Sequence, residues 1–154
     1  MKYLPILGAL LLSASPAVAD DFLYLRCKQS VDMVITDLTT SKIVEDRTID
    51  DISILKIDFS KKTMHDSRAE LTVNFALKNK IATIIQKVDD DEVKLDDVTK
   101  IKLSPPYSNS STGTGILKAK NQSSTHRAEG KCEEVDASVW NKSFKESEEL
   151  MQIS

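Results

Sequence analysis

The spacing of apolar residues constrains the fold of this chain more than any other feature, because apolar and polar residues alternate in the middle of the sequence. The clearest example is residues 70–77, in which every second position is apolar: Leu71, Val73, Phe75 and Leu77. Successive side chains of a β-strand point to opposite faces, so these four would share one face. The pattern therefore predicts a sheet with one buried face.

Residues 52–59 alternate in the same way, but the phase of the alternation changes between Ile54 and Leu55. One extra residue inserted into a strand produces such a change, so we expect a β-bulge at this point. Beyond the bulge, Leu55, Ile57 and Phe59 should face the buried side.

Shorter apolar runs predict further strands at residues 80–88, 93–95, 98–103, 115–120 and 124–132. Brief turns rich in Asp, Asn, Lys and Ser separate these runs, which favours antiparallel pairing of consecutive strands. Residues 31–51 show no sustained period, and we expect one or two edge strands there. The expected fold is mainly β, a single-domain antiparallel meander that closes as a small barrel or sandwich, with a short C-terminal helix.

The last part of the chain changes from strand spacing to helix spacing. Asp136 is a suitable N-cap, and Trp140 and Phe144 stand four residues apart on one helical face. We expect a helix at about residues 136–148 whose aromatic side chains pack onto the sheet. Residues 149–154 are expected to fray.

The N-terminal segment has the pattern of a cleaved secretory signal peptide. Lys2 supplies a positive charge, residues 4–12 are mainly apolar, and Ala17 and Ala19 form a small-x-small cleavage site. The apolar run is shorter than the roughly 18 residues that a membrane-spanning helix requires. We therefore expect cleavage after Ala19, no membrane anchor, and a periplasmic or secreted protein whose β-rich domain spans residues 20–148.

Removal of that segment leaves 135 residues with 20 basic and 24 acidic side chains, which gives a net charge of −4. A single domain of this length can bury a substantial core. A mildly acidic surface does not attract nucleic acid or an anionic membrane, so we expect neither of them as a partner.

Two cysteines, Cys27 and Cys132, stand near opposite ends of the remaining chain. In an oxidising compartment two cysteines match one disulfide, and we expect a Cys27–Cys132 bridge that ties the first strand to the last. Leu23, Leu25 and Cys27 alternate, so the sulfur of Cys27 should face the core. Redox-active and metal-binding pairs use closer spacing such as Cys-x-x-Cys, and a bridge between two molecules stays open as an alternative.

The sequence holds few residues suited to catalysis. Its two histidines are His65 and His126, and neither has a second histidine at metal-ligand spacing. Ser123, Ser124 and Thr125 precede His126, but no Gly-x-Ser-x-Gly elbow presents a serine. A small secreted hydrolase that uses His126 is therefore an alternative function, and a protein that is not an enzyme is favoured.

An acidic run, VDDDEVKLDD at residues 88–97, supplies carboxylate oxygens of the kind that calcium prefers. An EF-hand loop that begins at Asp89 would place Lys94 at the required glycine and Lys100 at the required bidentate glutamate. The spacing favours a solvated turn between two strands, and we assign no metal site and no cofactor. Calcium binding by residues 89–97 stays an open question.

Residues 104–115, SPPYSNSSTGTG, contain two of the four prolines and two of the four glycines of the chain. This composition predicts a long loop between two strands. Because loops often carry binding residues, Tyr107 on a base of Pro105 and Pro106 is a candidate ligand contact. A plain connection without a binding role is the alternative.

The ends of the chain, FLYLRC and GKC, joined over a β-meander, resemble the small periplasmic lysozyme inhibitors, whose disulfide also ties the two ends of a barrel. The central Ser-Gly-x-x-Tyr stretch of that family has no counterpart here, so the resemblance assigns no functional residue. The opening Gly-x-Trp of lipocalins is also absent, and the single tryptophan, Trp140, lies near the opposite end.

Together these patterns predict an exported, non-catalytic β-protein that binds a protein, a glycan or a small apolar ligand. The proline loop and the mouth of the barrel are the expected contact surfaces. A hydrolase and a periplasmic enzyme-inhibitor-like protein are the alternatives, and the oligomeric state stays open.

Overall fold

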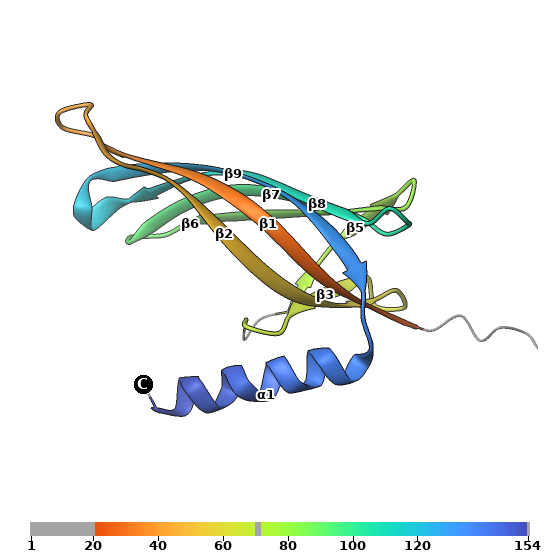
Figure 1. Cartoon of the computed structure of the whole chain (residues 1–154). Helices are drawn as coiled ribbons and strands as arrows, with labels where there is room; N and C mark the ends of the chain where they lie inside the picture. Colours follow the sequence, from red (N-terminus) through yellow and green to blue (C-terminus); the bar gives the residue numbers. More distant parts are fainter. Residues whose placement is uncertain (1–20, 70–71, 154) are drawn as a thin grey trace, which may run out of the picture.

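The computed structural model describes residues 21–69 and 72–153, so the signal peptide expected at residues 1–19 lies outside the described residues. The described chain forms nine β-strands, a short 3-10 helix and one α-helix (Figure 1). The strands are β1 (Phe22–Asp37), β2 (Ile43–Asp58), β3 (Thr63–Asp66), β4 (Thr72–Asn74), β5 (Ala76–Lys78), β6 (Ile81–Asp89), β7 (Val93–Lys102), β8 (Ser108–Leu117) and β9 (Gln122–Glu134). The 3-10 helix is Lys118–Lys120, and the α-helix α1 is Ala137–Ile153.

All nine strands belong to one antiparallel sheet in the order β4-β3-β2-β1-β9-β8-β7-β6-β5. The first strand lies beside the last, and the two strands at the ends of this order, β4 and β5, are separated in the chain by Phe75 alone. The sheet is therefore a nearly closed barrel. The predicted fold, an antiparallel meander with a C-terminal helix, is confirmed.

The barrel closes at one end only. β3 and β4 contain 4 and 3 residues, whereas β1 and β2 contain 16 residues each. In the described part of the chain, residues 43–53 of β2 therefore pair only with β1, and residues 84–89 of β6 pair only with β7. The inner face of the sheet is enclosed beside β3 and open beyond it.

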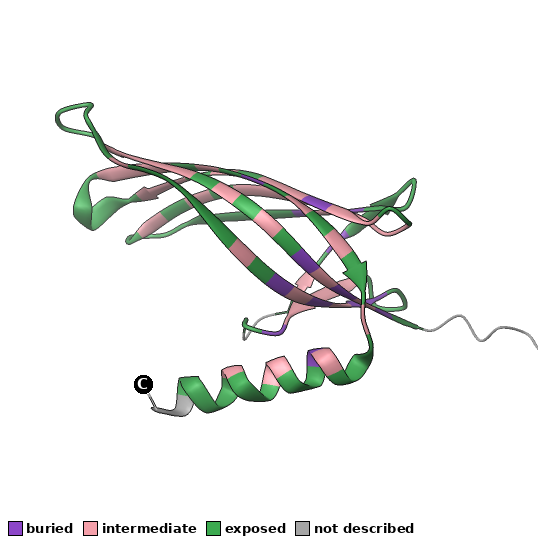
Figure 2. Ribbon diagram, viewed as in Figure 1, coloured by how far each residue is buried: buried purple, intermediate pink, exposed green. Residues whose placement is uncertain are grey.

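The hydrophobic core fills the closed end. Leu25, Ile57 and Ile101 are each at most 1 % exposed and face inwards from three different strands. Figure 2 shows buried positions on this part of the sheet, whereas the hairpin that joins β1 and β2 is exposed. Full burial of one such side chain stabilises the fold by about 1.5–3 kcal/mol, so the closed end supplies most of the hydrophobic stabilisation.

The disulfide joins Cys27 of β1 to Cys132 of β9, as predicted. The two residues stand directly opposite each other in the register of the two strands, with their Cα atoms 4.0 Å apart. Cys27 is fully buried in the core beside Leu25, so the predicted inward direction of its side chain is confirmed.

The bulge predicted between Ile54 and Leu55 does not occur. The register of β2 against β1 is unbroken there, and its irregularity lies instead between Ile35 and Thr36 of β1. The apparent change of phase arises because Ile52 and Ile54 are apolar residues on the outer face of the barrel. Leu55 and Ile57 face inwards as predicted.

The prediction for Phe59 is wrong, because this residue lies beyond the end of β2 and is exposed. The prediction of one or two edge strands in residues 31–51 is also incomplete, because this region forms the long outer halves of β1 and β2, and β1 is a central strand. The predicted strand at residues 70–77 is interrupted at Phe75, and residues 70 and 71 lie outside the described residues.

The largest correction concerns residues 104–115, which were expected to form a loop. Only residues 103–107 connect the strands, and β8 begins at Ser108 and runs to Leu117, where the expected strand at residues 115–120 gives way to the 3-10 helix. The inward positions of β8 are Asn109, Ser111, Gly113 and Gly115, so the strand lacks the apolar alternation that marks its neighbours.

The helix α1 begins directly after Asp136, as predicted, and packs on the outer face of the barrel against β2 and β3 (Figure 1). Its Trp140 stacks on Phe144 with ring centroids 4.9 Å apart, and both rings meet His65 of β3 edge-on. The helix continues to Ile153, beyond the end expected near residue 148, and the fraying expected for residues 149–154 stays a prediction. Among the described residues, no helix is both long and apolar enough to cross a membrane.

Candidate functional site

A pocket of about 250 Å³ lies on the inner face of the sheet, directly beside the core. Its apolar side is formed by Leu55, Met64 and Ile101, and polar side chains from β1, β2, β3, β7, β8 and β9 complete the lining: Gln29, Ser53, Asp66, Thr99, Asn109, Ser111 and His126. We call this the inner pocket. Polar groups with an apolar floor are the usual composition of a small-molecule site.

One half of the polar lining depends on Gly130 of β9. In the register of the sheet Gly130 lies between Asn109 of β8 and Gln29 of β1. A Cβ atom at Gly130 would collide with Oδ1 of Asn109, so only glycine lets the asparagine side chain cross β9. The crossing brings Nδ2 of Asn109 within 2.5 Å of Oε1 of Gln29, to which it donates a hydrogen bond.

This hydrogen bond continues toward the edge of the barrel. Nε2 of Gln29 donates to Asp51 at 3.0 Å, and the guanidinium of Arg68 donates to both oxygens of Asp51, at 2.7 and 3.2 Å. The bond from Arg68, and to a smaller extent that from Gln29, holds the pKa of Asp51 below its ordinary value. Arg68 also bonds to Asp66, the last residue of β3.

Asn109 is left with an unsatisfied acceptor. Its side chain is buried, at 8 % exposure, and its Oδ1 has no hydrogen-bond partner. Within the described residues only one other buried side-chain polar atom lacks a partner, Oγ of Ser147 on the helix α1. Because buried polar groups are nearly always paired, the unpaired oxygen of Asn109 requires an explanation.

The other half of the polar lining depends on Gly113 of β8, which lies between His126 of β9 and Asp97 of β7. A Cβ atom at Gly113 would stand 2.5 Å from Cε1 of His126, so the imidazole ring crosses β8 above the glycine. Nε2 of His126 reaches Asp97 at 3.3 Å and Oγ of Ser111 at 3.2 Å. Both halves of the pocket thus use a glycine to let a polar side chain cross one strand.

The contacts of Ser111 differ from those of a serine nucleophile. In a serine hydrolase the imidazole uses one ring nitrogen for the serine and the other for the carboxylate. Here Nε2 of His126 faces both groups, and the hydroxyl of Ser111 donates to Asp97 at 3.0 Å. The hydroxyl of Thr99 in turn donates to Ser111 at 3.2 Å. The arrangement is a hydrogen-bonded cluster that fixes the shape of the pocket wall.

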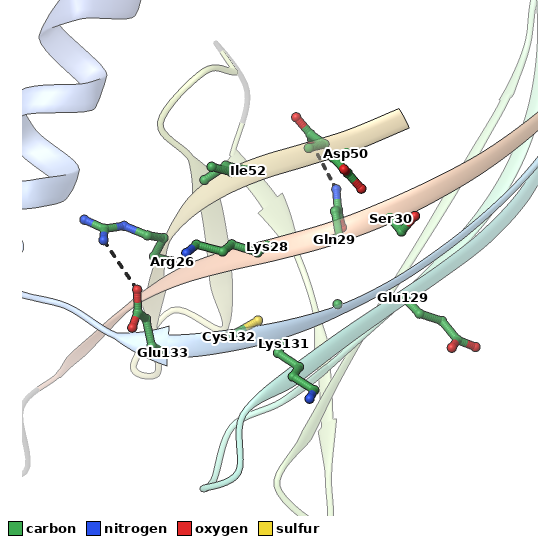
Figure 3. A pocket seen from close by; sticks show the side chains of 12 residues that line it. Arg26, Lys28, Gln29, Ser30, Asp50, Ile52, Glu129, Lys131, Cys132 and Glu133 are labelled. Atoms are coloured by element: carbon green, nitrogen blue, oxygen red, sulfur yellow. Dashed lines mark hydrogen bonds and ion pairs between the residues drawn. The ribbon is translucent and has the colours of Figure 1, made fainter. Parts of the chain in front are cut away.

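A second and larger hollow lies on the outer face, over β2, β1 and β9 (Figure 3). This outer groove has a volume of about 740 Å³, and its lining includes Arg26, Lys28, Lys131, Glu133 and Ile52. Arg26 pairs with Glu133 at 3.4 Å, and their side chains are 37 % and 60 % exposed. The charged groups of the groove reach solvent, so its size alone does not indicate a ligand.

The structure brings one predicted site residue, His126, into the inner pocket. Its neighbours there are Ser111 and Asp97, not the preceding residues Ser123, Ser124 and Thr125 that the sequence offered as partners. Gln29, Asn109, Ser111 and Asp97 were not identified from the sequence. No sequence signal marks the inner face of β8, because residues 108–115 are all polar or glycine.

The prolines of the segment 104–115 lie outside the inner pocket, whereas Asn109 and Ser111 of the same segment line it. Pro105 and Pro106 are exposed, and neither they nor Tyr107 line the inner pocket. The ring of Tyr107 packs against the core, and its hydroxyl donates to Glu134 at 3.0 Å. Burial, followed by this bond to Glu134, raises the pKa of Tyr107. The ligand contact predicted for these three residues stays a prediction.

The carboxylates of the acidic run are directed to separate partners. Asp89 pairs with Lys118 at 2.9 Å, and Asp90 accepts hydrogen bonds from the backbone of Glu92 and Val93 in the turn between β6 and β7. These bonds hold the pKa of both aspartates below the ordinary value. In the described part of the chain, no group of three or more His, Cys, Asp and Glu side chains is placed to hold a metal ion.

Searches of protein families, curated proteins and solved structures found no match for this chain.

Proposed function

We propose that this chain is an exported, non-catalytic binding protein that holds a small ligand in the inner pocket. The observation that carries the proposal is the buried Oδ1 of Asn109, which has no hydrogen-bond partner in the described residues. Leaving such a group unpaired costs about 1–3 kcal/mol. This cost is a large part of the free energy of unfolding of a typical domain, which is about 5–15 kcal/mol. The explanation that we propose is a ligand that forms a hydrogen bond with Asn109.

The composition of the inner face supports the same function. Aliphatic residues at Asn109, Ser111 and His126 would extend the core, and the apolar surface that they bury would stabilise the fold. The chain instead places polar side chains there, supported by Gly113 and Gly130 on the neighbouring strands. Stability alone does not explain this choice, whereas specific recognition of a ligand does.

Export is the second part of the proposal. It rests on the signal-peptide pattern that ends at Ala19 and on the disulfide, a bond that persists in oxidising compartments. N-terminal sequencing of the protein from the periplasm or the medium tests it directly. A chain that begins at Asp20 is the expected result, and a chain that keeps residues 1–19 in the cytoplasm would contradict export.

The pocket is tested with two variants of neighbouring residues on β1. Val31 lines the inner pocket and Ser30 lines the outer groove, so Val31→Phe fills the first hollow and Ser30→Phe obstructs the second. A library of small fragments is screened against the disulfide-bonded protein by saturation-transfer NMR. We expect bound fragments that are lost in Val31→Phe and retained in Ser30→Phe.

Two results would contradict this function. Fragments lost only in Ser30→Phe would favour the outer groove, and with it a larger partner such as an enzyme that the chain inhibits. If every fragment that binds the parent protein also binds Val31→Phe, the inner pocket is not a binding site.

A secreted hydrolase is the second candidate, because His126 contacts a serine and an aspartate in the inner pocket. Ester, glycoside and phosphomonoester substrates are incubated with the protein and with His126→Ala. We expect no turnover by either, since the hydroxyl of Ser111 donates its hydrogen bond to Asp97 and is not aligned by His126 for attack. Turnover that disappears in His126→Ala would replace the binding function with a catalytic one.

A further inference from the structure

Arg68 and Asn109 are linked by a chain of hydrogen bonds through Asp51 and Gln29. In this chain the donor and the acceptor of each bond are fixed. Asp51, which two nitrogens of Arg68 contact, is an ionised carboxylate and only accepts hydrogen bonds. Gln29 must therefore present its NH₂ group to Asp51, at 3.0 Å. The amide oxygen of Gln29 then faces Asn109, which must donate to it through Nδ2, at 2.5 Å.

This direction decides which atom of Asn109 is left over. If the amide of Asn109 were turned over, its oxygen would face the oxygen of Gln29 and the hydrogen bond would be replaced by repulsion. The guanidinium of Arg68 thus determines, through two intervening side chains, that the unpaired buried atom is an acceptor, Oδ1. A group that pairs with Asn109 must donate a hydrogen bond.

The charges around the pocket select among donors. Three carboxylates lie in or beside the inner pocket, those of Asp51, Asp66 and Asp97, against the single guanidinium of Arg68 and the imidazole of His126. The excess is negative, and electrostatic attraction favours a cationic donor over a neutral hydroxyl. A carboxylate ligand would meet an unpaired acceptor and a negative surface.

The size and floor of the pocket limit the rest of the ligand. Its 250 Å³ equal the liquid volume of about eight water molecules, since one water takes about 30 Å³. Leu55, Met64 and Ile101 offer an aliphatic surface beside the polar groups. A short alkyl chain with one donor group at its end matches both features.

We propose that the inner pocket binds small primary amines, with the ammonium group donating a hydrogen bond to Oδ1 of Asn109 and the alkyl part lying on Leu55, Met64 and Ile101. This assignment rests on the proposed binding function and adds the chemical class of the ligand. Ammonium is the compact donor that combines positive charge with the hydrogen bond that Asn109 lacks.

The test compares three probes of equal chain length: n-butylammonium chloride, n-butanol and sodium butyrate. Each is titrated into the ¹⁵N-labelled, disulfide-bonded protein, and chemical-shift changes are followed at the side-chain amides of Asn109 and Gln29, of which Gln29 remains in every variant. A probe of this size binds with a dissociation constant on the order of millimolar. We expect butylammonium to bind most tightly, butanol about tenfold more weakly, and butyrate not to bind, because a hydrogen bond gains strength when the donor is charged.

Two pairs of variants locate the binding. Val31→Phe should abolish the shift changes and Ser30→Phe should leave them, as in the fragment screen. Asn109→Ala should weaken butylammonium about tenfold, since it removes the acceptor, whereas Ser110→Ala, on the outer face of the same strand, should not change the affinity. The comparison of the three probes uses the unmodified protein, so it stands even where Asn109→Ala does not fold.

The outcomes separate this assignment from the proposed function. Butyrate or butanol bound in the inner pocket more tightly than butylammonium would overturn the assignment and leave a binding protein. The assignment would be overturned in the same way if none of the three probes bound, while larger fragments bound to the parent protein and not to Val31→Phe. If Val31→Phe and Asn109→Ala bound butylammonium as tightly as the parent protein does, the binding site would lie elsewhere, and this result would also overturn the assignment.

Discussion

Alanine substitutions at the three glycines of the described chain should lower stability in the order Gly130, then Gly113, then Gly115. All three face the inside of the barrel, and none has the positive φ that other residues avoid. The substitutions therefore differ only in the space that the added methyl group finds, so their ranking tests whether polar side chains cross the strands above these glycines.

Gly130→Ala should have the largest effect. The methyl group would collide with Oδ1 of Asn109 and would stand 2.6 Å from the backbone oxygen of Lys28 and 2.8 Å from Cβ of Gln29. Asn109 can rotate away, but Lys28 belongs to the paired backbone of β1 and cannot. Overpacking costs about 1–3 kcal/mol, and loss of the bond between Asn109 and Gln29 costs about 1–3 kcal/mol more. We expect a loss of about 2–6 kcal/mol in the free energy of unfolding.

At the other two glycines the closest contact is a side chain that can move, and at Gly113 the methyl group would also stand 3.1 Å from the backbone oxygen of Asp96. At Gly113 the methyl group would stand 2.5 Å from the ring of His126, which must swing away from Asp97, at a cost of about 1–2 kcal/mol. At Gly115 its closest neighbour is the hydroxyl of Ser124 at 2.8 Å, and the next atom is 3.8 Å away. The hydroxyl can rotate, and the reduced entropy of the unfolded chain returns about 0.4–1 kcal/mol, so Gly115→Ala should be nearly neutral.

Urea unfolding of the four proteins, followed by the fluorescence of Trp140, measures these differences. Trp140 is the only tryptophan and is buried between α1 and β3, so its emission reports the loss of the fold. Equal losses for all three substitutions would show that the glycines are required for reasons other than space. A loss at Gly115 as large as that at Gly130 would contradict the described positions of Asn109 and Ser124.

Two other perturbations test the covalent and ionic ties of the barrel. Joint replacement of Cys27 and Cys132 by alanine should lower the free energy of unfolding by about 4–5 kcal/mol, because the bridge closes a loop with a sequence separation of 105; a loss below about 1 kcal/mol in urea unfolding would contradict this entropic role. Arg68→Gln removes the main cause of the lowered pKa of Asp51. A lowered folded-state pKa stabilises the fold above the unfolded value of about 3.9, and this contribution disappears as the pH falls through the folded-state pKa. Stability measured from pH 7 down to pH 2 should therefore fall more for the parent protein than for Arg68→Gln, and parallel curves would refute the coupling.

The parts of the fold that could be predicted from the sequence are those that face the core. Leu23, Leu25 and Cys27 alternate because they line the closed end of the barrel, and Leu55 and Ile57 do the same on the neighbouring strand. Apolar periodicity records burial against other apolar groups, so it identifies strands only where they meet the core. The disulfide was predicted from the expected oxidising compartment and the number of cysteines, neither of which depends on periodicity.

β8 shows why the rest could not be predicted. Its inward residues face the polar inner pocket, so Asn109, Ser111, Gly113 and Gly115 stand where a core-facing strand would carry aliphatic side chains. The same glycine- and serine-rich composition is typical of loops, and no local rule separates the two cases. The polar inner face of β8 therefore explains both why residues 104–115 were wrongly predicted to be a loop and where the candidate site lies.

The residues of the inner pocket were also beyond prediction because they meet across strands. His126 reaches Asp97 over an intervening strand, and Asn109 reaches Gln29 in the same way. Sequence spacing identifies neighbours along one helix or strand, whereas these pairs depend on the register of three strands and on a glycine in the middle one. Knowledge of the register would have been sufficient to find both pairs.

The short length of β3 explains both where the barrel opens and how the polar groups of the inner pocket are oriented. β3 stops at Asp66, and directly beyond it Arg68 binds both Asp66 and Asp51 of β2, so an ion pair replaces backbone pairing at the point where β2 becomes an edge strand. A longer β3 would continue the ladder along β2 and would leave Asp51 without its guanidinium. Asp51 would then no longer orient Gln29, and Asn109 would lose the neighbour that fixes its oxygen as the free acceptor. The short strand that opens the barrel thus also determines, through Arg68, that the unpaired atom of Asn109 is an acceptor.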